Sequence, residues 1–233
     1  MPEYIKTKGI VLRNIPYGDN NLISHIYTES HGRLSFFVYG GQKKKKKNIY
    51  LPLNKLELVF ALDRKHELQK VKEAAWLENY KFHFDVKKSP VVFLVSELLA
   101  NTIDYEIKDG KMFSFLEKSL DFFNRTNKTA VFFSQFLVFF AYFSGILPEK
   151  DNGGIYFDFD NVAYERYKPV GDFYLDEKQT EFLSALLETM SYNEDFYLPA
   201  AIRHDLIDKF LKYFKLKFGI RDLKSYELFK RMY

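Results

Sequence analysis

The 233-residue chain contains no cysteine. This absence excludes disulfide bonds and thiolate metal sites. The sequence also lacks a Walker phosphate loop, a GxGxxG motif and an HExxH motif, so it predicts no ATP, dinucleotide or zinc-peptidase site. Ser24, His25 and His31 lack both a GxSxG turn and an acidic partner, so we interpret them as strand and turn residues. We therefore expect a protein that is not an enzyme.

Long hydrophobic runs are also missing. The longest apolar stretch, residues 130–147, is interrupted by Ser134, Gln135 and Gly145 and is too short for a membrane span. The first residues do not resemble a signal peptide. We expect a cytoplasmic protein without a membrane partner, in which the apolar stretch forms a buried core helix.

Acidic residues offer little support for a metal site. Asp158 and Asp160 alternate along a predicted strand, and Asp151 lies nearby. Their spacing is not that of a calcium-binding loop, and only one histidine, His204, follows His83. We interpret the aspartates as a solvated strand face and predict no metal and no cofactor.

The chain is rich in aromatic residues, and its charges are unevenly distributed. It carries 25 Phe and 17 Tyr, which can build a substantial core and also offer rings that stack on bases. Residues 1–80 have 14 basic against 8 acidic side chains, and residues 203–233 have 9 against 4. The middle, 81–202, has 12 against 19. This pattern indicates contacts with a polyanion at two places.

The first part of the chain reads as β-strands. Turn residues separate five segments with a period of two: 4–11, 22–28, 33–39, 56–62 and 67–71. Five short strands in about 75 residues suit the OB-fold, a small Greek-key barrel. The strand count alone also fits an SH3-like barrel.

The period becomes helical from Ser89 onwards. Helices are predicted at 89–103, 112–123, 129–144, 176–190 and 200–218. Ser89 reads as an N-cap, and Asp176 with Gln179 resembles a capping box. Residues 152–175 break the helical pattern and predict a short hairpin-like insertion. The fold class is therefore α+β, with an OB-fold domain at 1–80 and a helical domain at 81–233.

A run of five lysines is the sharpest single feature. Lys43, Lys44, Lys45, Lys46 and Lys47 follow Gly40-Gly41, in what we expect to be a flexible loop. The loop is either merely solvated or binds phosphates. Together with Lys8, Arg13 and Arg33 it predicts a nucleic-acid site that sets affinity without reading sequence. Phe37 or Tyr39 are candidates for stacking on bases.

Several short segments resemble one protein family. The segments are Gly9-Ile-Val-Leu12, Tyr17-Gly-Asp-Asn20, His31-Gly-Arg33, Gly40-Gly-Gln-Lys-Lys44, Gly145-Ile-Leu-Pro148 and Leu223-Lys-Ser-Tyr-Glu-Leu-Phe229. Their order and spacing are similar to those of RecO, the bacterial recombination mediator, over essentially the whole chain.

The resemblance implies a function. RecO-like proteins have an amino-terminal OB-fold and a helical domain, and they bind single- and double-stranded DNA. They anneal complementary strands and, with RecR, help to replace single-stranded DNA-binding protein with RecA. A member of this family would act in DNA repair and recombination in the cytoplasm, at the nucleoid.

The chain departs from the family in two places. Many members carry a four-cysteine zinc element where this chain has residues 151–175, so we expect a metal-free insertion there. Gln135 lies near an arginine with which some members grip the acidic tail of single-stranded DNA-binding protein. We expect that tail to dock beside helix 129–144, with Arg125 or Lys128 at its edge.

Two other functions remain open. An RNA-binding OB-domain protein, associated with the ribosome, would use the same cations and rings. A hydrolase built on the aspartates around 158 would need a divalent metal and would show turnover.

Overall fold

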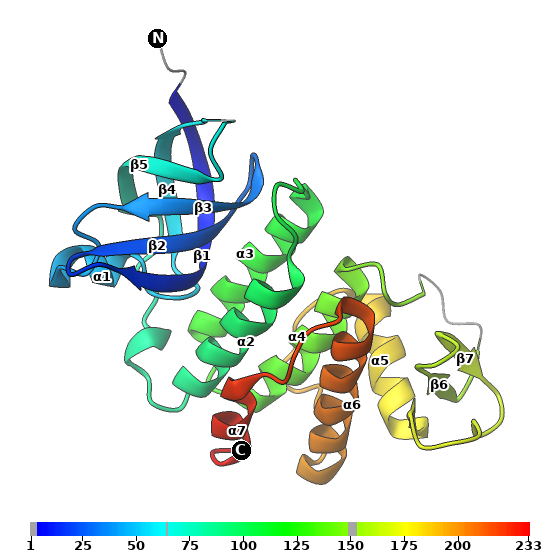
Figure 1. Ribbon diagram of the computed structural model, residues 1–233. Helices are drawn as coiled ribbons and strands as arrows, with labels where there is room; N and C mark the ends of the chain where they lie inside the picture. Colours follow the sequence, from blue (N-terminus) through cyan, green and yellow to red (C-terminus); the bar gives the residue numbers. More distant parts are fainter. Residues whose placement is uncertain (1–3, 64, 149–152) are drawn as a thin grey trace. The chain divides into compact units, whose positions relative to one another are not determined.

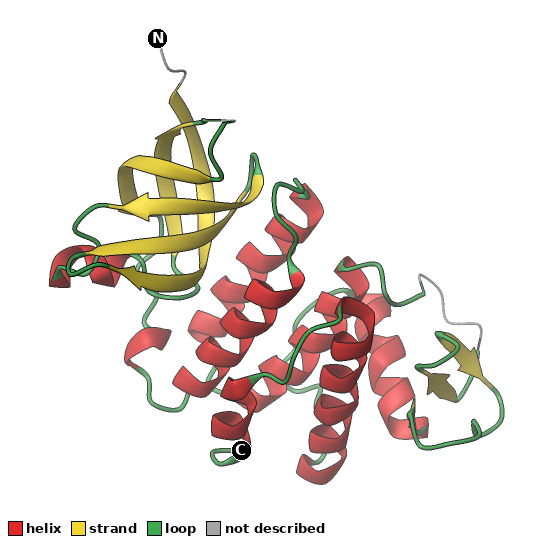
Figure 2. Cartoon of the chain, viewed as in Figure 1, coloured by secondary structure: helices red, strands yellow, loops and turns green. Residues whose placement is uncertain are grey.

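The computed structural model describes residues 4–63, 65–148 and 153–233 (Figure 1; Figure 2). The chain forms two compact units. The first contains the residues up to Asn124 together with Leu223–Tyr233, and the second is Arg125–Asp222. The domain boundary expected at residue 80 stays a prediction, because these units follow contacts between elements rather than the change of period.

The first unit is built on a closed five-stranded barrel. Its strands are β1 (Tyr4–Tyr17), β2 (Asn21–Thr28), β3 (Gly32–Val38), β4 (Lys55–Ala61) and β5 (Leu68–Trp76). They follow the order β1-β2-β3-β5-β4, and β1 pairs with β4 to close the barrel. All pairs are antiparallel except β3 with β5. This topology confirms the predicted OB-fold.

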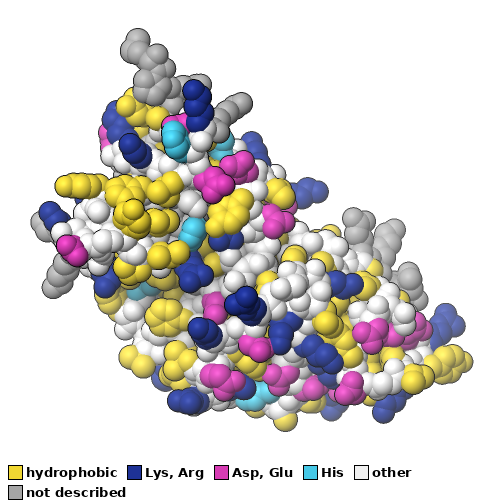
Figure 3. Space-filling view, in the orientation of Figure 1, with side chains coloured by type: hydrophobic (Ala, Val, Ile, Leu, Met, Phe, Trp, Pro, Cys, Tyr) yellow, Lys and Arg dark blue, Asp and Glu magenta, His cyan; other side chains and the backbone are white. Residues whose placement is uncertain are grey.

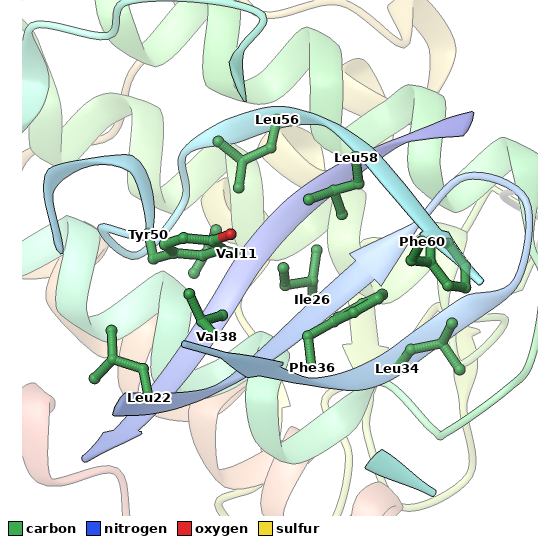
Figure 4. Packing of buried hydrophobic residues seen from close by; sticks show 10 residues of the cluster. All are labelled: Val11, Leu22, Ile26, Leu34, Phe36, Val38, Tyr50, Leu56, Leu58 and Phe60. Carbon is green, nitrogen blue, oxygen red and sulfur yellow. The ribbon is translucent and has the colours of Figure 1, made fainter. Parts of the chain in front are cut away.

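The barrel interior is filled by alternate side chains of the strands, and bulges interrupt this alternation in β1 and β5. Ile26, Phe36 and Leu58 are fully buried, and the rings of Phe36 and Phe60 meet edge to face at 5.1 Å (Figure 4). Burying one such side chain contributes about 1.5–3 kcal/mol. The period-two pattern in the sequence therefore reflects a real division between inward and outward residues.

The lysine run forms a short helix, so the expectation of a flexible loop was wrong. Helix α1 spans Lys44–Ile49, and the N–H of Lys47 donates to the carbonyl of Lys43 at 2.8 Å. The side chains of Lys43, Lys46 and Lys47 are exposed. Those of Lys44 and Lys45 lie outside the described part of the structure.

Two residues after α1 attach it to the barrel. The Asn54 amide donates to the carbonyls of Asn48 and Ile49, both at 2.9 Å. Tyr50 is buried with the barrel core. A run of like charges would unwind an isolated helix of this length, and these contacts supply the stability that the lysines lack.

Three helices and one helical turn complete the first unit. They are η1 (Phe82–Phe84), α2 (Ser89–Thr102), α3 (Gly110–Arg125) and α7 (Lys224–Lys230). The Glu97 carboxylate on α2 accepts from the backbone N–H groups of Lys224 and Ser225, at 3.1 and 2.8 Å. An anion at these unpaired N–H groups stabilises the start of α7 and joins the end of the chain to α2.

Helix α2 begins differently from the sequence prediction. Ser89 is not an N-cap, because its hydroxyl donates to the carbonyl of Asp85 at 3.0 Å instead of accepting from the helix. The capping box at α5 is confirmed: Asp176 accepts from the Gln179 N–H at 2.9 Å, and the Gln179 side chain accepts from the Asp176 N–H.

The second unit combines three helices with a small sheet. Its elements are α4 (Thr129–Phe143), β6 (Tyr156–Asp158), β7 (Ala163–Glu165), β8 (Tyr174–Leu175), α5 (Glu177–Thr189) and α6 (Ala200–Phe218). Helix α4 is mostly buried and packs on α5 and α6. The predicted hairpin is present as β6 and β7, and β8 adds a third strand that the sequence pattern did not reveal.

Aromatic packing holds the inserted sheet. The ring of Phe159 lies 4.8 Å from Phe173, 5.4 Å from Phe210 and 4.8 Å from Tyr213 on α6. Asp158 is buried and accepts from the Asp160 N–H and from the Asn161 side chain, both at 2.8 Å. It is thus a turn-forming residue rather than part of a solvated face.

Two kinds of feature are missing from the part of the chain that the structure describes. It holds no group of three acidic or histidine side chains placed to bind a metal ion, and Asp151 lies outside it. Among the same residues, no helix has both the length and the apolar character needed to cross a lipid bilayer.

We predict that the insertion keeps its fold without zinc. A chelator should leave the melting temperature unchanged, because ring packing around Phe159 holds the inserted sheet on α6. Substitution F159A should lower stability by about 3–5 kcal/mol. Thermal unfolding with and without chelator checks both, and one zinc ion per chain in metal analysis would contradict the prediction.

A second prediction concerns His83. Burial lowers its pKa from 6.5 to about 4, and its Nε2 donates to the Asn54 Oδ1 at 2.8 Å. In the unfolded chain the imidazole gains a proton near pH 6.5, which the folded state resists down to about 4. Stability should therefore be complete above pH 6.5 and fall by ~1–3 kcal/mol towards pH 4.

Urea unfolding at a series of pH values measures this effect. Substitution H83Q keeps a donor for Asn54 but removes the titrating group, so the decline should become shallower. Above pH 6.5 the imidazole is neutral in both states, so H83Q and the unaltered protein should lose no stability through this group there. Equal pH dependence of H83Q and the unaltered protein would refute the assignment.

Candidate nucleic-acid interface

One outer surface of the barrel combines rings with cations. A β-bulge between Val11 and Arg13 turns the residues after it so that odd-numbered side chains of β1 point outwards. They meet outward side chains of β2, β3 and β5. We call this surface the open face; it consists of Arg13, Ile15, Tyr17, Ile23, His25, Ser35, Phe37, Leu68 and Lys70.

The strand register arranges the open face in rows. Ile15, Ile23 and Phe37 lie opposite one another across β1, β2 and β3, and Lys70 on β5 completes this row. In Figure 3, hydrophobic side chains gather over the strands labelled β2 and β3 in Figure 1. An exposed hydrophobic surface of this kind indicates a binding site.

Aromatic rings run along the open face. Tyr17 is 55% exposed and meets Phe37 edge to face at 5.8 Å. At the other end Tyr105 is half exposed, with its ring 6.1 Å from that of His25. Rings exposed in this way stack on bases of any sequence, each contributing about 1–3 kcal/mol.

The cations stand at the two sides of these rings. Arg13 on β1 and Lys70 on β5 are exposed, and neither forms an ion pair with any other described residue. A backbone that crosses the strands would meet positive charge on both sides of the stacked bases. This arrangement fits a single strand of nucleic acid.

Arg33 does not belong to this surface, so its predicted phosphate contact is withdrawn. It is 9% exposed, and its guanidinium donates to the carbonyls of Ala100 at 2.6 Å and Ile103 at 3.0 Å. It also donates to the Tyr105 hydroxyl at 2.9 Å and lies 4.1 Å from the centre of that ring. Arg33 fixes the end of α2 on the barrel instead of contacting solvent.

Lys8 is partly committed to the protein. Its Nζ lies 3.3 Å from the Glu117 carboxylate on α3, which also receives Lys55 at 3.6 Å. Asp121 lies 3.5 Å from the Lys55 Nζ and accepts from the Tyr80 hydroxyl at 2.6 Å. A phosphate would compete with Glu117 for Lys8, so we expect a weaker contribution from Lys8 than from Arg13.

Helix α1 is held in place next to the open face. The Gln42 amide donates to the carbonyls of Gly18 and Asn21, at 2.9 and 3.0 Å, and the Asn21 side chain accepts from the Gly40 N–H at 2.9 Å. These bonds join the turn after β1 to the segment before the lysines. The lysine run is therefore fixed relative to Tyr17 and the rings.

His25 contributes a ring rather than a charge. Burial lowers its pKa, and the nearby Arg33 and Arg13 lower it further. The imidazole is therefore neutral at neutral pH, with its Nδ1 2.9 Å from the Ser35 hydroxyl. A phosphate close to it would oppose this effect and favour protonation.

The predicted tail-binding residues lie in the second unit. Arg125 is exposed. The Lys128 Nζ contacts the Asp195 carboxylate at 3.1 Å and the Glu194 carbonyl at 3.2 Å. Gln135 is fully buried and donates to the carbonyls of Asn193 and Phe196, at 2.6 and 2.7 Å. It fixes a loop within this unit, and the tail site stays a prediction.

Sequence reasoning missed several residues of the interface. Lys70 and Tyr17 were not selected, although each continues an outward alternation, Lys70 with Leu68 and Tyr17 with Ile15. Tyr105 comes from the segment after α2 and is held at the face by the Arg33 guanidinium and by backbone pairing with β3. Strand register would have revealed the first two, but Tyr105 required the tertiary fold.

Comparisons with known proteins agree on one family. The family model "Recombination protein O N terminal" matches residues 1–80, which contain the barrel. A DNA repair protein RecO of Bacteroides fragilis is 30% identical over 171 residues, covering 70% of this chain and 71% of its own. That of Phocaeicola vulgatus is 28% identical, covering 80% of each chain. The Flavobacterium psychrophilum protein is 27% identical over 98% of this chain and 99% of its own.

The different environments of Arg13, Lys70 and Arg33 lead to a prediction. Replacing Arg13 and Lys70 by alanine should weaken single-strand binding and reduce its salt dependence by ~0.7 log units per log salt for each phosphate that is no longer neutralised. Unfolding should be unaffected, because both side chains are exposed. Substitution R33M should instead cost ~1.5–3 kcal/mol of stability and leave the salt dependence unchanged.

Fluorescence anisotropy across a salt series and urea unfolding of both variants provide the measurements. A loss of salt dependence in R33M, measured where that variant is folded, would return Arg33 to the interface. An unchanged slope in the Arg13 and Lys70 double variant would remove the open face from DNA binding.

Proposed function

We propose that this chain, which belongs to the RecO family, acts as a recombination mediator in DNA repair. It binds single- and double-stranded DNA through the open face and α1. The observation that carries this proposal is a row of exposed rings bounded by Arg13 and Lys70, with the lysine helix fixed beside it. The relatives named DNA repair protein RecO also support a role in DNA repair.

The proposed mechanism is charge neutralisation. Two complementary strands repel each other through their phosphates, and cations on one protein reduce that repulsion. The rings hold unstacked bases of one strand while its partner approaches, which promotes annealing. No bond is made or broken, so no residue needs a catalytic role and the protein acts without turnover.

We further propose the partners that the family resemblance implies. The protein would help RecA to replace single-stranded DNA-binding protein, together with RecR, in the cytoplasm at the nucleoid. The acidic tail of single-stranded DNA-binding protein would dock near Arg125 and Lys128. To reach Lys128, a tail carboxylate would have to displace Asp195.

A ribosome-associated RNA-binding protein is the second candidate. Stacking and phosphate contacts on the open face do not depend on the 2′-hydroxyl, so RNA would also fit there. Annealing assays with DNA and RNA strands of the same sequence separate the two functions. Faster annealing of DNA strands supports the mediator, whereas acceleration of RNA alone would favour the alternative.

Replacing Lys43 to Lys47 with alanine should weaken binding to all DNA sequences to a similar degree and slow annealing. The salt dependence should fall by ~0.7 log units per log salt for each lysine that contacts single-stranded phosphate. Stability should barely change, because alanine favours the helix and exposed lysines contribute little to the fold.

The control replaces Lys111 and Lys118, two exposed lysines on α3, with alanine. This variant also loses positive charge but should keep nearly the wild-type salt dependence. If the five-lysine variant binds and anneals as the unaltered protein does, α1 is only a solvated helix. The proposed phosphate contacts of its lysines would then be refuted.

A further inference from the structure

A hollow of about 450 Å³ opens in the barrel wall where β5 leaves β3. Strand β5 pairs with β3 only from Leu68 to Lys70, and from Val71 to Trp76 it pairs with β4 alone. The end of β3 and helix α1 form the opposite wall. The lining residues are Val38, Tyr39, Lys46, Ile49, Tyr50, Glu57, Val59 and 71–75.

The hollow continues the open face. Tyr39 lies two residues beyond Phe37 along the chain and is 77% exposed. Lys70, the last open-face residue of β5, directly precedes Val71 in the hollow. A single strand that follows the rings towards β5 would reach the hollow next.

The inner surface suits a flat ring. Val59, Val71 and Ala74 are partly buried and give the hollow an apolar floor, with Ile49 of α1 on the other side. The volume lies within the range of ~300–1,000 Å³ that is usual for pockets that bind small molecules. One nucleobase is small enough to enter it, with the Tyr39 ring available for stacking.

The charged side chains at the rim of the hollow differ in the contacts that they already make. Glu57 pairs with Lys6 at 3.0 Å, and Lys72 lies 4.1 Å from the centre of the Tyr4 ring. Glu73 is exposed and has no ion pair with any other described residue. On the other wall Lys46 of α1 lines the hollow, and its Nζ donates to the Tyr39 carbonyl at 3.0 Å.

We propose that this hollow receives one unstacked base of the bound single strand and that Glu73 favours bases whose edge donates hydrogen bonds. The proposal rests on the proposed function, since it assumes a strand on the open face. A carboxylate only accepts hydrogen bonds. Cytosine, adenine and guanine offer an amino group, whereas thymine places carbonyl oxygens beside its single ring N–H.

The test compares labelled oligo(dC) and oligo(dT) of equal length by fluorescence anisotropy at neutral pH. The unaltered protein should bind oligo(dC) about fivefold more tightly, the lower end of what one base contact discriminates. Substitution E73Q gives a side chain that both donates and accepts, so the ratio should fall to about one. Removing Glu67, an exposed acid just before β5, by E67Q should leave the ratio unchanged.

The outcomes separate this proposal from the proposed function. A ratio of about one in the unaltered protein, or an equal ratio in E73Q, would overturn the base pocket while salt-dependent DNA binding persists. The same result is expected if the hollow instead takes an extended peptide along the unpaired edge of β5. Loss of all DNA binding in the unaltered protein would overturn the proposed function itself.

Discussion

The first unit depends above all on Arg33. Its guanidinium binds two carbonyls at the end of α2, groups that a helix leaves without partners, and it does so from the outer side of β3. A cation is favoured there because the helix dipole places negative charge at that end. The same side chain holds Tyr105 beside His25, so one contact both joins α2 to the barrel and extends the ring surface. In the proposed interface Arg33 would therefore act indirectly, by positioning Tyr105.

The segments that carry the family resemblance mainly lie where loops and helices contact the barrel. Gly32 has a positive φ, and a Cβ there would lie 2.4 Å from the carbonyl oxygen of Ile107, so the turn before Arg33 requires glycine. Gly9 lies so close to Ile26 and Leu58 that a side chain would displace both. The segment beginning at Tyr17 and the one beginning at Gly40 bind each other through Gln42. These motifs specify how loops and helices attach to the barrel, and the binding residues depend on that attachment.

Features of the structure that depend on residues close together in the sequence were predicted better than features that depend on distant segments. Strand alternation and the capping box of Asp176 with Gln179 involve neighbours in sequence, and both were predicted correctly. The helix at the lysine run was missed, because its stability comes from Asn54 and Tyr50 rather than from its own residues. Ser89 was misassigned because Asp85 offers its hydroxyl a nearer partner. Arg33 was taken for a surface cation since sequence alone does not show that α2 ends against β3. Errors therefore concentrate where a distant segment decides the environment of a side chain.

Aromatic residues have two roles in this chain: they pack the inserted sheet, and they form the ring surface of the open face. Around Phe159, rings from the sheet and from α6 pack against one another and hold the sheet on that helix. On the barrel, Tyr17 and Tyr105 remain half exposed. Exposed rings are costly in water unless a partner covers them, and a base offers a flat partner without demanding a particular sequence. Cations beside such rings add attraction for phosphates but do not rigidly orient them. The proposed annealing would need loose holding that depends little on sequence, since a strand that is bound too firmly could not be released to its complement.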